Sequence, residues 1–514
     1  MTTPGELSAE DTFSTRSRWW GFSFLIAAVL IVNLNQTITT ISAPSIIDDL
    51  NTNVEIASMS TTIYLVIAAS FLITLSRLAG RVGHRRVLVA SMILFAAASA
   101  LIAAAPAAWV LLIGRGLQGL VFAAVMPVSL AFINAEFPDS DRGTQTHRRR
   151  AIAFAVWATV TGIAIAAGPV WGGWWNGTSF GWRGAFMFNV AFAIVVVFGI
   201  MFTLSARSAA DEVEFRGIDV VGVIILTLGI GLLVFGLEFG QAGLWSVREL
   251  DVSTPELDFS ALAFTASMLV AAMLLFVLFV FIERRHNREG KVAVLDLRLF
   301  RIRSYRDATI AISLTYFGNF GLLFVSSVFI QFGMNGSAFD AGLTIAATGL
   351  GILAGGPVST PLVHKFGPRR VVLAFVLYQP VILVVLIVLT FIEIQYWDLA
   401  LMLFLYGLGW GVSYSAFLNI AYRDVPSDLA RLAGAAQIAS RLLAGAIGTA
   451  VLGSVIATTA GTTQSVSDST NYVAGFRWTL AISAVVSLVG VLFAYRIPRE
   501  RSDAAYDGTT RERR

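Results

Sequence analysis

The chain of 514 residues contains no cysteine, only two lysines and little charge of either sign. The lack of cysteine excludes disulfides, iron–sulfur clusters and thiolate zinc sites. The four histidines are scattered along the sequence, so we expect no metal site and no cofactor. Neither lysine lies in a G-x-x-x-x-G-K-[S/T] motif, and the chain therefore has no P-loop with which to bind a nucleotide.

Charged residues make up 13% of the chain, roughly half of the usual share in soluble domains. Hydrophobic residues make up 56%, and the mean hydropathy is +0.76. A transmembrane helix needs about 20 mostly apolar residues. Fourteen stretches meet this condition, at 20–41, 54–75, 87–105, 109–134, 151–171, 185–204, 219–238, 261–282, 308–331, 341–363, 371–392, 398–421, 431–457 and 477–496. These runs predict an all-α polytopic membrane protein.

The basic residues predict the orientation, because cytoplasmic loops of membrane proteins are enriched in lysine and arginine. With the N-terminus placed in the cytoplasm, 31 of the 36 basic residues fall in cytoplasmic segments and three fall outside. The remaining two, Arg115 and Arg441, fall inside predicted spans. We therefore expect both termini to be cytoplasmic, in agreement with an even number of spans.

Two cytoplasmic loops resemble each other at an offset of 284 residues: LAGRVGHRRV at 78–87 and LVHKFGPRRV at 362–371. The repeat predicts two parallel six-helix halves with two helices inserted between them, an architecture typical of transporters. The predicted divisions are a cytoplasmic tail at 1–18, the N-terminal half at 19–205, the inserted helices at 206–283, a linker and C-terminal half at 284–496, and a second tail at 497–514.

Five segments carry motif-like patterns: SRLAGRVGHRR at 76–86, RGLQG at 115–119, GPVWGG at 168–173, WRGAFMFN at 182–189 and LDLRLF at 295–300. In this order they resemble the motifs of the fourteen-span drug/proton antiporter branch of the major facilitator superfamily. Each match is weak alone, but five in the right order on fourteen spans indicate the family strongly. The resemblance covers roughly 20–495 and implies the major facilitator fold and secondary transport by alternating access.

The repeated loops and the GPVWGG segment are candidate moving parts. Glycine permits tight connections between helices, and basic side chains face anionic lipid headgroups. Because this loop pattern occurs twice, it predicts a gating role; the alternative is the ordinary enrichment of basic residues in cytoplasmic loops. The gating residues are Leu78, Gly80, Arg81, Gly83, Arg85, Arg86, Lys365, Gly367, Arg369 and Arg370. The glycines of the GPVWGG segment allow helices to approach closely, and its proline can bend the helix. The segment therefore predicts a hinge between the halves, with ordinary small-residue packing as the alternative. The hinge residues are Gly168, Pro169, Gly172 and Gly173.

Burying an arginine side chain inside a membrane costs free energy unless the guanidinium has a polar partner or contacts water. An intramembrane arginine therefore indicates a functional site. Arg115 shares a helix face with Gln118 and lies at a depth similar to that of Asn35, so these side chains could face each other across a cavity. Snorkelling to the outer surface is the alternative. The second candidate is Arg441, which could instead cap a carbonyl of a broken helix. The predicted substrate and coupling cavity comprises Asn35, Gln36, Arg115, Gln118, Asn319, Gln437 and Arg441.

The chain departs from the family pattern at two acidic positions. The resemblance implies a proton-exchanging aspartate in span 1 and an aspartate in the first loop motif, but this chain has Asn35 and Gly80 there. Asparagine has no proton to exchange near neutral pH. None of the 32 acidic residues falls in the middle of a predicted span. Proton antiport through the family's usual site is therefore not expected. Transport would be coupled through an edge carboxylate such as Glu238 or Glu136, would be coupled to another ion, or would not be coupled at all.

The sequence favours a secondary transporter in the plasma membrane of a bacterium that exports amphipathic small molecules by alternating access. A positive interior favours an anionic or zwitterionic cargo over lipophilic cations. The alternatives are a lipid or lipid-conjugate translocator without proton coupling and a non-transporting membrane assembly subunit. We expect no enzymatic activity, because acidic, histidine and cysteine side chains do not converge. The expected partners are the lipid bilayer, a small-molecule substrate and, in the coupled alternative, protons. We expect a monomer and no nucleic acid.

Overall fold

The computed structural model describes residues 9–137, 145–203, 219–244, 259–289, 296–392, 394–426, 429–460 and 469–498. Within these residues, fourteen helices are long and apolar enough to cross a membrane, which confirms the predicted fold class. They are α1 (Ala9–Asp49), α2 (Val54–Val82), α3 (His84–Ala103), α4 (Ala108–Glu136), α5 (Gln145–Asn176), α6 (Gly181–Thr203), α7 (Val220–Leu244), α8 (Phe259–Arg288), α9 (Arg303–Val328), α10 (Ala338–Phe366), α11 (Pro368–Leu389), α12 (Tyr396–Arg423), α13 (Ala430–Ala460) and α14 (Ser469–Arg496). Two short helical segments, η1 (Leu297–Arg301) and η2 (Phe329–Gly333), flank α9.

Several helices extend beyond the apolar runs that predicted them. α1 begins at Ala9, within the predicted tail, and α2 continues to Val82. A helix satisfies its own backbone hydrogen bonds, so it need not end where hydropathy falls at the edge of the hydrocarbon layer. The apolar part of α1 that could span a membrane begins at Trp19. Most of the two predicted tails, 1–8 and 499–514, lies outside the described residues.

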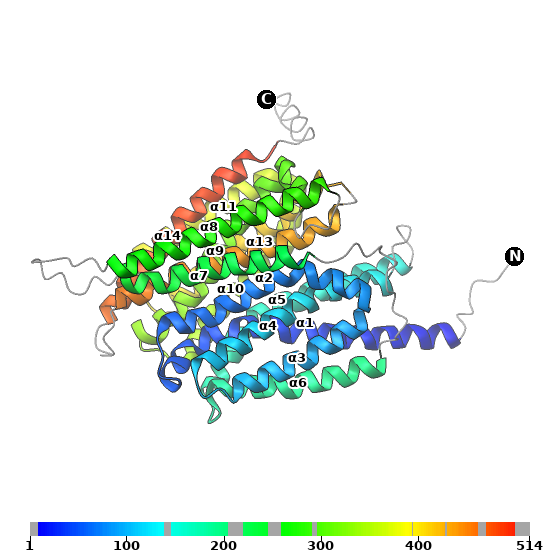
Figure 1. The fold of residues 1–514 in the computed structure, drawn as a ribbon, viewed down its shortest axis with the longest axis horizontal. Helices are drawn as coiled ribbons and strands as arrows, with labels where there is room; N and C mark the ends of the chain where they lie inside the picture. The colour runs from blue at the N-terminus through cyan, green and yellow to red at the C-terminus, as the bar shows by residue number, and fades with distance from the viewer. Residues whose placement is uncertain are drawn as a thin grey trace, which may run out of the picture.

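The helices form two groups of six with the same internal pattern of packing (Figure 1). In the first group α1 packs against α5 and α6, and α3 packs against α4 and α6. In the second group α9 packs against α13 and α14, and α11 packs against α12 and α14. The pairing of α2 with α4 likewise recurs as that of α10 with α12. The recurrence extends the loop repeat at 78–87 and 362–371 to the whole six-helix unit.

The two halves meet along two helix pairs, α2 with α13 and α5 with α10. Glycine brings the α5 and α10 backbones together: a Cβ built on Gly342 would lie 2.4 Å from the Pro169 carbonyl oxygen, and one on Gly173 would lie 2.5 Å from the Ala338 carbonyl oxygen. At the same end of the bundle, the Gln331 side-chain amide donates to the Ile41 carbonyl oxygen at 3.1 Å. The halves therefore touch mainly through backbone and small residues.

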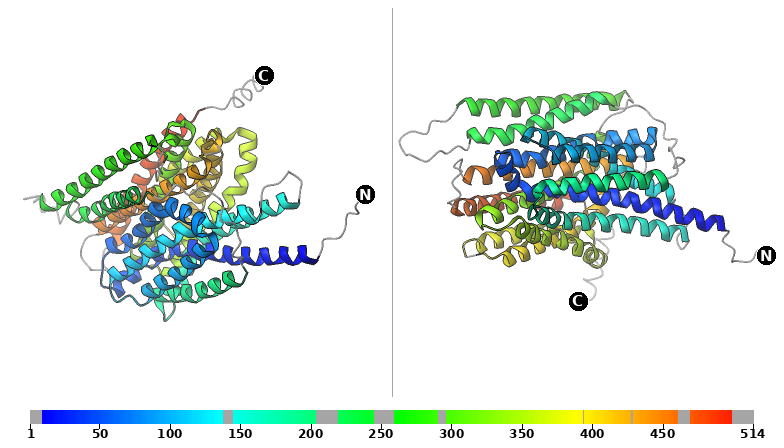
Figure 2. Two further views of the ribbon diagram at one scale, coloured as in Figure 1. Left: turned by 45° about the vertical axis from the view of Figure 1, so that its right-hand side comes forward. Right: turned by 90° about the horizontal axis from the view of Figure 1, so that it is seen from below.

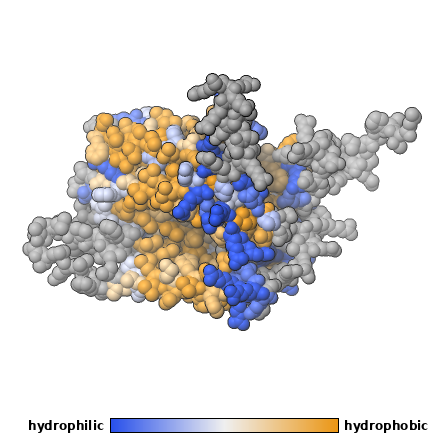
Figure 3. Space-filling view, turned by 90° about the horizontal axis from the view of Figure 1, so that it is seen from above, coloured by the Kyte–Doolittle hydropathy of each residue, from blue (hydrophilic) through white to orange (hydrophobic). Residues whose placement is uncertain are grey.

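The inserted helices α7 and α8 lie at one edge of the bundle (Figure 2). They pack against each other, and α7 also contacts α2 and α13. An apolar cluster joins these four helices and consists of Ile73, Val223 and Phe279 with Leu432 and Ala435 packed against it. The remaining surface of α8 is apolar and exposed, with Met273, Leu274 and Val277 each at least 60% exposed. A hydrophobic surface bounded by a stripe of hydrophilic residues is visible in Figure 3, as a protein in a bilayer requires.

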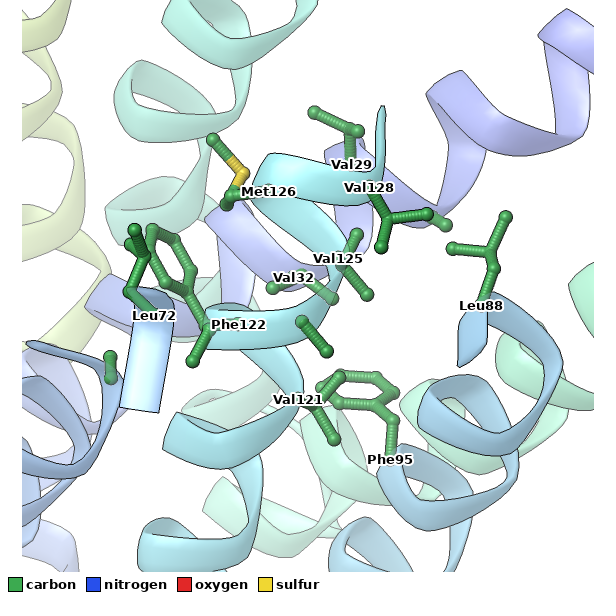
Figure 4. Packing of buried hydrophobic residues seen from close by; sticks show 14 of the residues in the cluster. Val29, Val32, Leu72, Leu88, Phe95, Val121, Phe122, Val125, Met126 and Val128 are labelled. Atoms are coloured by element: carbon green, nitrogen blue, oxygen red, sulfur yellow. The ribbon is translucent and has the colours of Figure 1, made fainter. Parts of the chain in front are cut away.

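The core of the N-terminal half is packed by aliphatic and aromatic side chains. Val121 and Val125 of α4 lie beside Phe95 and Leu88 of α3 (Figure 4). Lipid tails are as apolar as these side chains, so within a bilayer they stabilise the fold mainly through van der Waals packing. This packing holds α4, which carries Arg115, in a fixed position between its neighbours.

Candidate functional site

Arg115 lies in the interior of the N-terminal half and has no exposed surface. Its Nε donates to the Ser60 carbonyl oxygen at 3.1 Å, and its Nη1 donates to the Asn35 carbonyl oxygen at 3.2 Å and to Gln118 Oε1 at 2.9 Å. The guanidinium carbon lies 4.4 Å from the centre of the Tyr64 ring. These contacts of the charge are therefore to neutral oxygens and an aromatic face.

Asn35 and Gln118 complete a polar cluster around this arginine. Asn35 Nδ2 donates to Gln118 Oε1 at 2.8 Å, Gln118 Nε2 donates to Ser99 Oγ at 3.0 Å, and Asn189 Nδ2 donates to Asn35 Oδ1 at 2.9 Å. All four of these side chains are fully buried. The structure thus brings Asn35, Arg115 and Gln118 together, but in direct contact within a packed core and not across an open cavity.

Sequence reasoning missed two members of this cluster, Ser99 on α3 and Asn189 on α6. Asn189 is the last residue of the segment at 182–189, so the motif marked it without indicating its partner. Gly119, the last residue of the segment at 115–119, has a packing role: a Cβ there would lie 2.4 Å from the Tyr64 carbonyl oxygen. The absence of a side chain lets α4 approach α2 closely enough for Arg115 to reach the α2 backbone.

Arg441 lies in the C-terminal half and has a different environment. Its Nη1 donates to the Tyr414 hydroxyl, and its guanidinium carbon lies 5.1 Å from the centre of the Tyr316 ring. Trp410 stacks on Tyr414 with ring centres 5.3 Å apart and contacts Tyr316 edge to face at 4.9 Å. Arg441 is half-buried, so this aromatic cluster surrounds a charge that is partly accessible. The sequence indicated the arginine but not the rings from α9 and α12.

Three buried donors in this region have no hydrogen-bond partner in the described part of the chain: Arg441 Nε, Gln437 Nε2 and Trp410 Nε1. Gln437 lies one turn before Arg441 on α13 and is 1% exposed. Unpaired buried donors cost about 1–3 kcal/mol each, so they indicate a place where a ligand acceptor or water binds. The other two predicted cavity residues, Gln36 on α1 and Asn319 on α9, are also buried.

The two repeated loops contain equivalent glycines and equivalent arginines. Gly83 and Gly367 have φ angles of +102° and +80°, which L side chains rarely adopt. Arg85 Nη2 donates to the Met201 carbonyl oxygen at 2.6 Å, and Arg369 Nη2 donates to the Tyr495 carbonyl oxygen at 2.8 Å. Each of these two arginines thus binds the carboxyl end of the last helix of its own half, where the helix dipole favours a cation.

The remaining predicted gating residues lie at the same two connections. The side chains of Arg81, Arg86, Lys365 and Arg370 are exposed, and Leu78 and Gly80 lie on the last turn of α2. A Cβ added to Gly80 would meet nothing within 4 Å, so this position has room for the aspartate of the family pattern. A gating role for these loops stays a prediction.

The predicted hinge segment lies in α5 between α1 and α10. α5 is one continuous helix through Pro169. A Cβ on Gly168 would lie 2.1 Å from Thr37 Oγ1, and one on Gly172 would lie 3.3 Å from the Ile38 carbonyl oxygen. Gly168 and Gly172 thus fit α5 against α1, whereas Pro169 and Gly173 fit it against α10. A hinge at this place stays a prediction.

The buried acidic side chains in the described part of the chain all lie near helix ends. They are Asp219, Glu283, Asp296 and Asp307. Of the edge carboxylates considered for coupling, Glu136 is the last residue of α4, and the side chain of Glu238 lies outside the described residues. Among the described residues, the contacts of Arg115 and Arg441 are to backbone carbonyls, an amide and tyrosine side chains, which agrees with the sequence pattern at Asn35.

Comparison with known proteins decides the family. A family model described as Major Facilitator Superfamily matches residues 25–449. The chain belongs to the Major Facilitator Superfamily. It is a multi-pass membrane protein and a secondary transporter that exports small molecules.

Relatives of this superfamily member support the assignment over most of the chain. The chain is 27% identical over 445 residues to the "Probable actinorhodin transporter" of Streptomyces coelicolor, covering 85% of this chain and 72% of that protein. It is 25% identical over 491 residues to the "Putative multidrug resistance protein MdtD" of Escherichia fergusonii, covering 95% and 96%. A solved "auto inhibited POT family peptide transporter" has the same fold, with a TM-score of 0.63 at 14% identity, covering 93% of this chain and 98% of that one.

Proposed function

We propose that this transporter exports an anionic or zwitterionic aromatic amphiphile, bound at the Arg441 cluster of the C-terminal half. The observation that carries the proposal is the half-buried Arg441 guanidinium, which contacts tyrosine side chains and whose Nε has no hydrogen-bond partner among the described residues. The free donor offers a hydrogen bond to a carboxylate or phenolate, and Tyr316, Trp410 and Tyr414 offer faces to an aromatic ring system.

The relatives are consistent with this class of cargo. One is named a transporter of actinorhodin, and another is the "Tetracenomycin C resistance and export protein" of Streptomyces glaucescens. A lipophilic cation would meet two positive charges in the same interior, the fully buried Arg115 and the half-buried Arg441. Positive charge in the interior repels a positively charged cargo. Selection against cations therefore follows from this repulsion as well as from the hydrogen bonds to the arginine that a cation cannot make.

The proposed transport cycle uses no proton exchange at the family's span 1 position, because Asn35 is an amide that bonds Gln118, Asn189 and the Arg115 guanidinium. The orientation follows the basic residues, with both termini in the cytoplasm and the protein in the plasma membrane of a bacterium. α1 begins and α14 ends at the same end of the bundle, which supports this placement (Figure 1). We propose a monomer as the working unit, since each half supplies its own polar cluster.

The test uses the purified full-length protein in proteoliposomes and two xanthene dyes that differ in charge, anionic fluorescein and cationic rhodamine 123. We expect uptake of fluorescein and little uptake of rhodamine 123. Arg441→Gln removes a charged hydrogen-bond donor worth about 1.5–3 kcal/mol and should reduce fluorescein uptake at least about tenfold. The matched control is Arg423→Gln, because Arg423 is exposed at the end of α12 and pairs with Asp424.

Two results would count against this proposal. Preferential uptake of rhodamine 123 would contradict the anionic cargo, and unchanged fluorescein uptake in Arg441→Gln would remove the C-terminal site. A fluorescent phospholipid serves as a third probe, and its movement without movement of either dye would favour a lipid translocator instead.

A further inference from the structure

Three unpaired N–H donors lie at successive levels of the Arg441 cluster. They are Gln437 Nε2 and Arg441 Nε on α13 and Trp410 Nε1 on α12, and none has a hydrogen-bond partner among the described residues. We call these three residues the donor column. A negative charge on the cargo explains the unpaired donor of Arg441, but Gln437 and Trp410 are neutral and call for a different kind of acceptor.

The spacing of the donor column follows from helix geometry. Gln437 lies four residues before Arg441 on α13. Trp410 lies four residues before Tyr414, whose hydroxyl accepts the hydrogen bond from Arg441. Four residues of α-helix rise about 6 Å. Because α12 and α13 are consecutive spans and run in opposite directions, Gln437 lies nearer the end of the bundle with the repeated loops and Trp410 nearer the opposite end.

The donor column therefore extends about 12 Å along the bundle, with the guanidinium at its middle level. Aromatic rings run beside it. The Arg441 guanidinium carbon lies 5.1 Å from the centre of the Tyr316 ring, and the Trp410 ring contacts the same ring edge to face at 4.9 Å. Phe320, one turn further along α9, stacks on Tyr316 with ring centres 5.9 Å apart. Since α9 packs against both α12 and α13, these rings lie beside both helices that carry the donors.

The two neutral donors are more deeply buried than the groups around them. Gln437 is 1% exposed and Trp410 is 5% exposed, whereas Arg441, Tyr414 and Phe320 are half-buried. A hydrogen bond made in such an interior is electrostatically stronger than one made in water, and a buried donor left unpaired is costly. A site built from such donors therefore rejects an analogue that lacks the matching acceptor more strongly than an apolar pocket rejects a change of size.

The shape of the donor column selects among anionic aromatic molecules. An alkyl carboxylate or a plain aromatic acid pairs with Arg441 and leaves both neutral donors without an acceptor. A planar system of fused rings with ring-bound carbonyl or phenol oxygens carries acceptors at several places along its length. These acceptors are fixed on a rigid frame, so placing them beside the donors costs little conformational entropy.

We propose that the donor column recognises ring-bound oxygen acceptors of a polyoxygenated fused-ring aromatic cargo, and that Gln437 and Trp410 are the specificity-determining residues. The inference rests on the proposed function, because it takes the Arg441 cluster as the place where the cargo binds. Arg441 binds the negative charge, the rings of Tyr316 and Tyr414 contact the faces of the cargo, and the two neutral donors bind its ring oxygens.

The test compares two sulfonates that share charge and fused-ring frame and differ in their ring oxygens, 9,10-anthraquinone-2-sulfonate and anthracene-2-sulfonate. Isothermal titration calorimetry on the purified full-length protein in lipid nanodiscs measures the Kd of each, and empty nanodiscs give the correction for binding to lipid. We expect the anthraquinone to bind at least about tenfold more tightly than the anthracene, because only the anthraquinone offers ring carbonyls to the neutral donors.

Two variants remove the neutral donors with little change of shape. Trp410→Phe keeps an aromatic ring without the N–H, and Gln437→Leu replaces the amide with an apolar side chain. Each should reduce the preference for the anthraquinone to about threefold or less and change the Kd of the anthracene less than about twofold. Trp397→Phe is the matched control and should keep the full preference, because Trp397 lies on the same helix as Trp410 and is 79% exposed.

Melting temperatures without cargo separate recognition from a structural role. Removing an unpaired buried donor takes away no hydrogen bond within the protein, so Trp410→Phe and Gln437→Leu should not melt lower than the wild type by more than the Trp397→Phe control does. A large loss of melting temperature in both variants would show that these groups hold the fold together, and would overturn the assignment of specificity to them.

Arg441→Gln distinguishes this inference from the proposed function. Both sulfonates carry the same charge, so this variant should weaken both. Unchanged binding of both sulfonates in Arg441→Gln contradicts the proposed cargo site. Weaker binding of both in Arg441→Gln, together with equal binding of the two by the wild type, leaves the cargo site standing and overturns the donor column. The donor column is also overturned if neither Trp410→Phe nor Gln437→Leu lowers the preference, and failure of both sulfonates to bind contradicts both proposals.

Discussion

Replacing Asn35 with aspartate exchanges one nitrogen for one oxygen beside Arg115 and tests the main departure from the family pattern. Asn35 Nδ2 and Arg115 Nη1 both donate to Gln118 Oε1, at 2.8 and 2.9 Å. An ionised aspartate turns two acceptor oxygens toward each other, which costs about 1–3 kcal/mol. The guanidinium lies within about 6 Å of the new charge and attracts it by about 3 kcal/mol at an effective dielectric of about 20.

The two contributions nearly cancel, so we expect Asn35→Asp to fold and to hold an ion pair in place of an unpaired guanidinium. The interior then loses one positive charge. At the same dielectric, a unit charge roughly 12 Å away changes the attraction for an anion by about 1.4 kcal/mol, so an anionic cargo at that separation would bind about tenfold more weakly. The variant also gains a group that can exchange a proton in span 1, so its transport should respond to an imposed pH gradient more strongly than that of the wild type.

The assay is dye uptake in proteoliposomes with a pH gradient of each sign. Asn419→Asp is the matched control, because Asn419 is an exposed asparagine on α12 whose side-chain amide donates to the Ser415 carbonyl oxygen of the same helix. The reasoning is refuted if Asn35→Asp improves fluorescein uptake, or if Asn419→Asp lowers it equally.

Three further predictions concern the scaffold. Gly83→Ala forces an L side chain into a φ of +102° and should destabilise the protein by about 1–2 kcal/mol, seen as a lower melting temperature in detergent, whereas Gly80→Ala should be neutral. Gly342→Leu places side-chain atoms against the Pro169 carbonyl oxygen and should abolish transport while the protein still reaches the membrane, as measured by uptake against surface expression. Hydrogen bonds from Arg298 outweigh burial and hold the pKa of Asp296 below its usual range, so this carboxylate stabilises the linker above pH 4 and loses that effect as pH falls; melting curves of wild type and Asp296→Asn should converge in acid.

Features that depend on local sequence were predicted well. The fourteen spans follow from apolar runs of sufficient length, and the tight connections at Gly83 and Gly367 follow from glycine between two helices. The shared face of Arg115 and Gln118 follows from a spacing of three residues, and the structure shows the two side chains bonded. In each case the physical cause acts within one helix or one turn.

Features that depend on packing between distant segments were missed. Asn189 reaches Asn35 across 154 positions, and the rings around Arg441 come from α9 and α12. Periodicity gives the face of a helix but not the partner on the other side. Glu283 shows the same limit: the predicted span ended at 282 and left this residue in a loop, whereas α8 continues to Arg288 and Glu283 is fully buried on it, near enough to interact electrostatically with Arg77 of α2.

The distribution of polar contacts explains how the halves can move apart without disrupting either arginine site. Arg115 binds residues of α1, α2 and α4, and Arg441 binds residues of α9 and α12, so each charged cluster stays within one half. The contacts across α5 and α10 are mainly between glycine and backbone, and the hydrogen bond from Gln331 to Ile41 is a neutral one. A neutral hydrogen bond contributes about 0.5–1.5 kcal/mol, whereas exposing a buried guanidinium from its cluster costs several kcal/mol. Alternating access therefore follows the weak contact between the halves at α5 and α10.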